Sequence, residues 1–120
     1  MGCVWGTYRW SGGALARATA SAPWAHARRA ELQQGQQVQQ ALKSARQEFG
    51  PVSILVNNAG SAASAAFTDT PVSSFGAMYA VHVLGAVHTM QAVLEEMTAL
   101  PAARIINICS TAALKPYKTI

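Results

Sequence analysis

Residues 51–60 read PVSILVNNAG, and this stretch decides the fold class of the chain. Its first half, residues 52–56, is short, apolar and rich in β-branched side chains, which is typical of a strand buried on both faces of a parallel sheet. The strand should end at the Asn-Asn-Ala-Gly tetrapeptide, where two carboxamides and a glycine leave backbone groups free. Ligands of open α/β sheets bind outside the carboxyl ends of the strands, so we expect a binding site there.

An amphipathic helix is predicted directly before this strand. Its apolar side chains recur at the i, i+3, i+4, i+7 and i+11 positions of one helix face: Val38, Ala41, Leu42, Ala45 and Phe49. Gly50 and Pro51 supply the signal that ends the helix. A helix followed by a buried strand is half of a right-handed βαβ unit, so this part of the chain indicates an α/β domain.

A long apolar helix is predicted after the strand. Thr70 is expected to be its N-cap and Pro71 its first residue, and Pro101 should end it near Leu100. The only charged residues in this segment are two glutamates. Apolar side chains cover nearly the whole circumference, which is typical of a helix buried on more than one side.

A second buried strand is predicted near residues 104–108. Ile105, Ile106 and Ile108 give it the apolar, β-branched character of a parallel-sheet strand. Ser110 follows at its carboxyl end.

Together these segments resemble the short-chain dehydrogenases/reductases, an NAD(P)-dependent Rossmann family. The resemblance rests on the Asn-Asn-Ala-Gly tetrapeptide, on the later strand that ends at Ser110, and on the apolar segment beginning Thr70-Pro71 between them. It is strong over residues 38–114 and weak upstream. It implies an α/β fold, namely an incomplete Rossmann-type doubly wound parallel sheet with flanking helices. It also implies hydride transfer between a nicotinamide and a small-molecule alcohol/carbonyl substrate.

One small domain is expected from 120 residues. Residues 1–34 would form a degenerate cofactor-turn region, 35–114 a well-matched core, and 115–120 the start of a truncated active-site segment. The interval from Gly12 to Val52 is shorter than the roughly 60 residues that three helices and two strands need. We therefore expect one strand–helix unit to be missing near residues 33–35, through a deletion, a splice variant or a gene-model error.

The glycine-rich turn of the family can be aligned with residues 4–16. Gly6 and Gly12 match the first and last glycines, whereas Trp10 stands at the middle one. An indole there would obstruct the approach of the backbone to the pyrophosphate. A chance Gly/Ala-rich segment or a scrambled amino terminus is the alternative interpretation.

Basic residues near this turn favour NADP over NAD as the cofactor. Arg9 lies within the turn, and Arg28-Arg29 lie where the family would contact the 2′-phosphate. A guanidinium group matches phosphate geometry well. The alternative is a solvated arginine pair.

The resemblance implies roles for individual residues. Ser110 would hydrogen-bond the carbonyl or developing alkoxide oxygen. His82 stands where the family has an asparagine that holds a proton-relay water, a role that depends on local distortion of the helix, and a packed helix histidine is the alternative. The implied cofactor-binding residues are Gly6, Arg9, Gly12, Arg28, Asn57, Asn58, Ala59 and Gly60. The two asparagines would brace the sheet, and the last two residues would line the adenosine side.

The tyrosine and lysine of the family's catalytic group are not at the family's spacing. Tyr117 is the only tyrosine after Ser110, and Lys118 directly follows it. We therefore expect a chain truncated just short of the catalytic helix and lacking dehydrogenase activity. The alternative function is a non-catalytic remnant or oligomerisation module, because Trp10, His82 and the missing catalytic pair depart from the family and the helix over residues 71–100 is apolar. The equivalent helix of the family packs against a partner subunit. Homo-oligomerisation through residues 71–100 is therefore implied.

Composition narrows the remaining possibilities. The chain is 51% hydrophobic and 12% charged with a net charge of +4, and no basic run exceeds two residues, which argues against nucleic-acid binding. Two cysteines without a CxxC motif favour a cytoplasmic setting. His82, Gly85 and His88 interrupt the most apolar segment, so no membrane-spanning helix is expected. The two histidines are six residues apart on different helix sides, so no metal site is expected.

Overall fold

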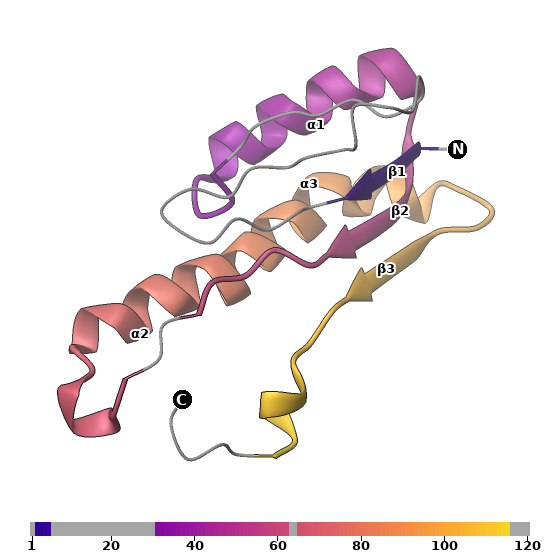
Figure 1. Cartoon of the computed structure of the whole chain (residues 1–120). Helices are drawn as coiled ribbons and strands as arrows, with labels where there is room; N and C mark the ends of the chain where they lie inside the picture. Colours follow the sequence, from indigo (N-terminus) through magenta and orange to yellow (C-terminus); the bar gives the residue numbers. More distant parts are fainter. Residues whose placement is uncertain (1, 6–30, 63–64, 116–120) are drawn as a thin grey trace, which may run out of the picture.

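Three parallel strands form one sheet in the order β1-β2-β3 (Figure 1). The computed structural model describes residues 2–5, 31–62 and 65–115. The helices and strands are β1 (Gly2–Trp5), α1 (Gly35–Phe49), β2 (Val52–Asn57), the 3-10 turn η1 (Phe67–Asp69), α2 (Val72–Tyr79), the π-helical turn η2 (Ala80–Leu84), α3 (Gly85–Thr98), β3 (Arg104–Asn107) and the 3-10 turn η3 (Thr111–Ala113).

The predicted buried strand and the helix before it are confirmed. Leu55 of β2 lies opposite Val4 of β1 and Ile105 of β3, so β2 is the middle strand. Helix α1 ends at Gly50, which has a φ of 80° and whose N–H donates to the Arg46 carbonyl oxygen at 2.9 Å. A positive φ favours glycine, which explains why the helix stops there.

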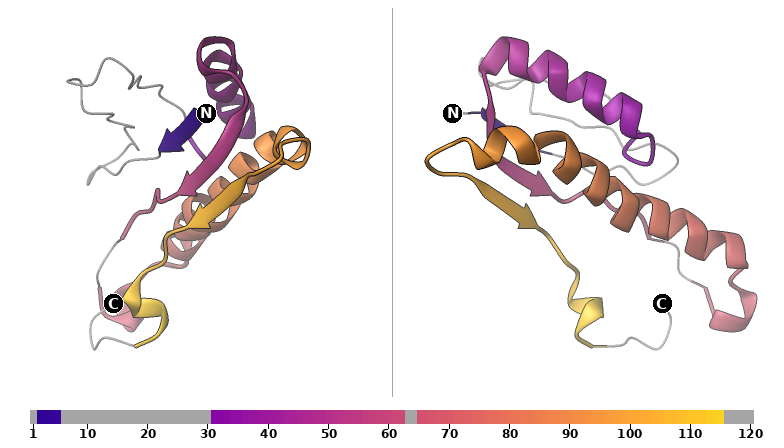
Figure 2. Two further views of the ribbon diagram at one scale, coloured as in Figure 1. Left: turned by 90° about the vertical axis from the view of Figure 1, so that its right-hand side faces the viewer. Right: turned by 180° about the vertical axis from the view of Figure 1, so that it is seen from behind.

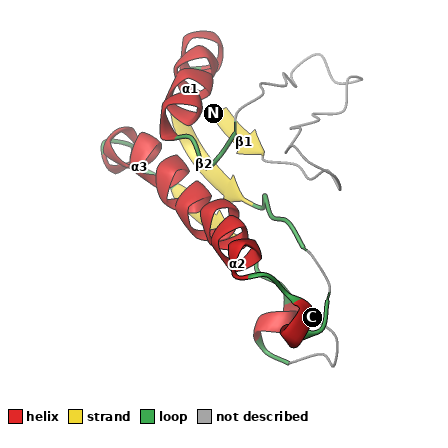
Figure 3. Ribbon diagram, turned by 90° about the vertical axis from the view of Figure 1, so that its left-hand side faces the viewer, coloured by secondary structure: helices red, strands yellow, loops and turns green. Residues whose placement is uncertain are grey.

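Helices α1 and α3 lie on the same side of the sheet (Figures 2 and 3). The core forms between these helices and β2 and consists of Val38, Leu42, Val52, Leu55, Val93 and Met97. The first two belong to the apolar stripe predicted on α1. Full burial of such a side chain stabilises the fold by about 1.5–3 kcal/mol.

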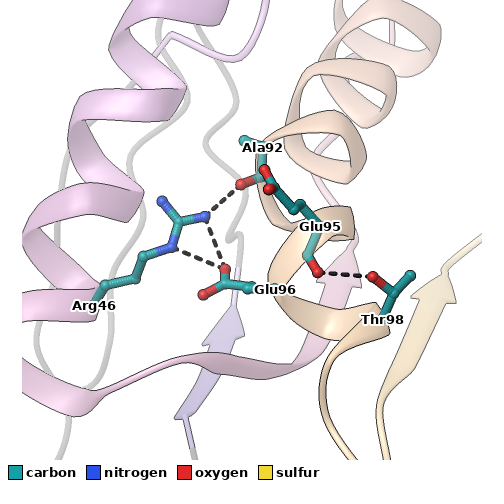
Figure 4. A network of polar contacts seen from close by, with 5 residues as sticks. All are labelled: Arg46, Ala92, Glu95, Glu96 and Thr98. Carbon is teal, nitrogen blue, oxygen red and sulfur yellow. Dashed lines mark hydrogen bonds and ion pairs between the residues drawn. The ribbon is translucent and has the colours of Figure 1, made fainter.

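A polar bridge joins the two core helices, with Arg46 reaching from α1 toward α3 (Figure 4). The Arg46 guanidinium on α1 contacts one carboxylate oxygen of Glu96 on α3, at 2.9 Å from Nε and 2.8 Å from Nη2. It also donates to the carbonyl oxygen of Ala92. On the same helix, the Thr98 hydroxyl donates to the Glu95 carbonyl oxygen at 2.7 Å. The bridge is thus a direct polar connection between α1 and α3 through part-buried side chains.

The long apolar helix is present as the continuous run α2–η2–α3, but its start differs from the prediction. Pro71 is the N-cap and Val72 the first helical residue. Thr70 does not cap this helix, because its hydroxyl donates to the Ala66 carbonyl oxygen at 2.9 Å. The threonine therefore ends the preceding 3-10 turn instead.

Only one side of this helical run is covered by the described residues. Gly85, Val93 and Met97 are buried on α3, whereas Val72 and Tyr79 are 85% and 56% exposed. The packed surface faces the sheet and α1, and the remaining surface has no neighbouring layer among the described residues. Burial of the remaining surface, which the family resemblance assigns to a partner subunit, stays a prediction.

The same run meets the length and hydropathy criteria for crossing a membrane. It spans Val72–Thr98, 27 residues, with a mean hydropathy of 1.3 over its most apolar window. His82, Gly85 and His88 were expected to keep this segment from meeting the criteria for a membrane-spanning helix, and that expectation was wrong. Core helices of soluble proteins meet the same criteria, and α3 packs directly on the sheet.

Strand β3 is an edge strand among the described residues. It was predicted to be buried, yet Ile106 is 44% exposed and Ile108, just beyond its end, is 55% exposed. Only α3 and β2 contact it extensively. The prediction was wrong because an apolar run indicates that a strand suits burial on two faces, and here only one face is covered.

Candidate functional site

The carboxyl ends of β2 and β3 lie next to each other at one end of the sheet, which we call its carboxyl edge. Asn57 and Asn107 end the two strands opposite each other. The Asn57 side chain donates from Nδ2 to Asn107 Oδ1 at 2.8 Å, and its carbonyl oxygen accepts from the Ile108 N–H at 2.8 Å. Asn57 thus holds the end of β3 with both its side chain and its backbone, which extends the pairing beyond the strands.

A threonine of α3 supports this asparagine from the helix side. Thr89 Oγ1 lies 2.7 Å from Asn57 Oδ1. No sequence pattern points to Thr89, because a threonine inside an apolar helix normally bonds only to its own helix backbone. No local pattern relates residues 57 and 89. The contact arises because β2 and α3 pack together.

His82 holds the loop that follows the tetrapeptide. Its Nε2 lies 2.7 Å from the Ser61 carbonyl oxygen and 3.2 Å from the Ser61 nitrogen. One ring nitrogen cannot donate to the oxygen and accept from the N–H in the same tautomer. The shorter separation favours the tautomer in which Nε2–H donates to the oxygen. The imidazole therefore tethers the loop to the helix.

The helix around His82 is distorted as the proton-relay hypothesis requires. Residues Ala80–Leu84 form a π-helical turn between two α-helical segments. Single π-helical turns inside α-helices occur frequently at functional sites. Histidine therefore occupies this position without straightening the helix, although its imidazole is already engaged with Ser61.

Ser110 lies three residues beyond the end of β3 and is exposed. It is the N-cap of η3, where its Oγ accepts from the Ala112 N–H at 3.1 Å. Accepting this hydrogen bond does not use the hydroxyl proton. The serine is therefore placed by its own turn and keeps a proton to donate.

The other predicted cofactor-binding residues fall into two groups. Asn58 is exposed, and Ala59 and Gly60 are half-buried, directly beyond the end of β2. Four further positions lie outside the described residues, and these are Gly6, Arg9, Gly12 and Arg28. Within the described ranges, no group of three or more His, Cys, Asp or Glu side chains is arranged to hold a metal ion.

The second helix histidine fastens the segment before α1. His88 Nδ1 lies 2.8 Å from the Leu32 carbonyl oxygen, and a Cβ at Gly35 would stand 3.3 Å from its ring. Leu32 in turn lies so close to Gly85 that a Cβ there would stand 3.0 Å from the leucine Cβ. Side chains of the helical run therefore hydrogen-bond to three separate segments at this end of the sheet. Thr89 contacts Asn57, His82 contacts Ser61, and His88 contacts Leu32.

The strand order, the parallel pairing and the helices define an incomplete Rossmann-type α/β protein. The model of the short chain dehydrogenase family matches residues 11–120, so the chain belongs to that family. The family and fold predicted from the sequence are thereby confirmed.

Similar proteins carry oxidoreductase names. An uncharacterized oxidoreductase of Staphylococcus epidermidis is 35% identical over 78 residues, which are 65% of this chain and 34% of the relative. The 3-ketodihydrosphingosine reductase of Mus musculus is 37% identical over 76 residues, which are 63% of this chain and 23% of the relative. The chain thus spans about a third or less of the length of these relatives.

Solved structures superpose on most of the chain. A gluconate 5-dehydrogenase from Burkholderia cenocepacia in complex with NADP and tartrate gives a TM-score of 0.69 at 31% identity, over 76% of this chain and 36% of that one. NAD+-bound xylitol dehydrogenase gives 0.70 at 29% identity, over 76% and 35% of the two chains.

Proposed function

We propose that this chain supplies the cofactor side of an NAD(P)-dependent oxidoreductase that interconverts an alcohol and a carbonyl. The observation that carries the proposal is the edge where β2 and β3 end together. There Asn57 clamps Asn107, the loop beyond Gly60 is tied to the helix, and Ser110 follows on the neighbouring strand. Family membership and the dinucleotides named in the structures of similar proteins support it.

The chemistry of this edge suits a dinucleotide. Backbone groups of residues 58–60 and the Ser110 hydroxyl lie there, and groups of this kind hydrogen-bond ribose hydroxyls and amide groups. Ala59 and Gly60 have small side chains or none, which lets a ligand approach the backbone closely. The nicotinamide, when bound, supplies the hydride.

In this proposal each residue of the chain has a separate task. The Ser110 hydroxyl donates a hydrogen bond to the carbonyl oxygen of the substrate and so orients the reacting group. The backbone of residues 58–60 lines the adenosine side. His82 holds the loop through Ser61, and its proton-relay role remains a proposal that competes with this tethering.

The proposal favours NADP over NAD. Arg9 and Arg28 are the residues assigned to the 2′-phosphate, because a guanidinium binds a phosphate through two parallel hydrogen bonds. Fluorescence titrations with NADPH and NADH test this preference. Equal affinity for both, or no weakening on Arg28→Ala, would contradict it.

The 120-residue chain itself is proposed to lack catalytic turnover. Its sequence contains no Tyr-x-x-x-Lys to deliver and tune a proton. Purified chain should therefore show no NADPH-dependent reduction of carbonyl compounds in an absorbance assay. Measurable turnover would contradict this part of the proposal. An extended reading frame should reveal the Tyr-x-x-x-Lys motif after Ser110, and its absence would count against an oxidoreductase.

The second candidate function is a docking module without catalysis. It is supported by the apolar side chains that the helical run leaves exposed, among them Val72, Tyr79 and Leu94. The occupant would be a second copy or an intact relative, in a cytoplasmic setting. Co-expression with an intact relative, followed by size-exclusion chromatography, tests this function. Separate elution would remove it.

A further inference from the structure

One hydroxyl on α3 connects the helix to the edge of the sheet. Thr89 Oγ1 lies 2.7 Å from Asn57 Oδ1, 2.9 Å from the Ala86 carbonyl oxygen and 3.2 Å from that of Gly85. All three neighbours are acceptors, and a hydroxyl has one proton to donate. The shortest of the three separations is the one to Asn57. Two oxygens this close need a proton between them, so the hydroxyl donates to the asparagine.

The opposite end of the Asn57 carboxamide holds β3. Its Nδ2 donates to Asn107 Oδ1 at 2.8 Å, and the Asn57 carbonyl oxygen accepts from the Ile108 N–H. The oxygen and nitrogen of a carboxamide can exchange places by rotation. If both asparagines were reversed, Asn57 Nδ2 would donate to Thr89 Oγ1. The contact between Thr89 and Asn57 is therefore a hydrogen bond in either orientation.

We propose that Thr89 is a positioning residue for the segment that leads to Ser110. Its hydroxyl fixes the rotation of the Asn57 carboxamide, which holds Asn107 and with it the course of the chain to the serine. The value of this arrangement for catalysis rests on the proposed function. Thr89 acts through Asn57 and touches neither substrate nor cofactor. Without the hydroxyl, one end of a half-buried carboxamide would lose its partner, and the carboxamide would rotate more freely.

Three variants of the full 120-residue chain test this role. Thr89→Val keeps the shape of the side chain and removes the hydroxyl, whereas Thr89→Ser keeps the hydroxyl. Thr98→Val is the matched control, because the Thr98 hydroxyl lies on the same helix and donates to the Glu95 carbonyl oxygen. The measurements are hydrogen exchange of the Ile108 N–H and the NMR signals of the Asn57 side-chain amide.

Thr89→Val should speed exchange of the Ile108 N–H about fivefold, as expected for the loss of one hydrogen bond. It should also shift the Asn57 side-chain amide signals. Thr89→Ser should restore both readouts, and Thr98→Val should change neither. If Thr89→Val does not fold, Thr89→Ala provides the variant without a hydroxyl.

Two results would overturn the proposal. One is a Thr89→Val chain whose Ile108 exchange and Asn57 signals match those of Thr98→Val. The other is a Thr89→Ser chain that behaves like Thr89→Val, because the effect would then come from the methyl group. All signals are recorded without dinucleotide. Failure of the wild-type chain to bind NADPH in a separate titration would thus contradict the proposed function alone.

Discussion

Two neighbouring residues of α3 show how differently two sides of this molecule are built. Val93 is fully buried against β2 and α1, whereas Leu94, the next residue, is 51% exposed. Both are apolar, and nothing in the local sequence separates them. The first side has its neighbours within the described chain, and the second has none there. Apolar character therefore indicates that a residue suits burial, and the neighbouring layer decides whether burial occurs.

The largest effect is expected on the buried side. Leu55→Ala removes a side chain that is 1% exposed at the centre of the sheet. It should lower the free energy of unfolding by about 2–5 kcal/mol, because it leaves a cavity in a small core. Leu94→Ala on the exposed side should change it by less than about 0.5 kcal/mol. Urea unfolding followed by circular dichroism measures both. Similar losses would mean that the two sides are equally packed.

Two glycines of the helical run differ in the space around them. The Cβ added by Gly76→Ala meets no atom within 4 Å. This variant should stabilise the chain by up to about 1 kcal/mol, since alanine favours helices more than glycine does. Gly85→Ala places a Cβ 3.0 Å from the Leu32 Cβ. The expected result is a net loss of about 1 kcal/mol, because overpacking outweighs the helix propensity. Thermal unfolding of both variants measures the difference, and equal gains would contradict the close approach of Leu32.

The smallest effect concerns the bridge between α1 and α3. Arg46→Met removes the partner of Glu96, whose side chain is 19% exposed, and should cost about 1 kcal/mol in urea unfolding. Lys43→Met on the exposed face of α1 is the control and should stay within about 0.5 kcal/mol of wild type. The gap between the two variants should narrow in high salt. A gap that does not depend on salt would indicate lost packing of the arginine stem instead.

The sequence predicted those parts of the fold that depend on local pattern. Helix α1, the stop at Gly50 and the β-branched run of β2 were all confirmed, because each reflects a repeat or a backbone preference. Of the stripe predicted on α1, Val38 and Leu42 are buried, whereas Phe49 is 40% exposed. The N-cap was misplaced by one residue. Thr70 and Pro71 are both good residues for the start of a helix, and the 3-10 turn before them used the threonine.

The site was predicted in outline only. The tetrapeptide located the edge of the sheet, but the contacts that shape it join residues far apart in the sequence. Thr89 reaches Asn57, and His82 reaches Ser61, only because the helical run lies along the ends of the strands. No periodicity or motif records such contacts. The pattern of apolar residues likewise does not predict the π-helical turn at Ala80–Leu84.

The most direct test of the central claim is a titration of the 120-residue chain with NADPH, followed by backbone amide signals. Residues just beyond the ends of β2 and β3 report on the proposed site. Residues at the opposite end of the sheet serve as the control. Shifts are expected at Asn58, Gly60, Ser61 and Ser110, and none at Gly50 or Ala103. Weak binding is expected, since Trp10 stands at a position where the family has glycine. Shifts confined to Gly50 and Ala103, or no shifts at millimolar dinucleotide, would contradict a cofactor site at the carboxyl edge.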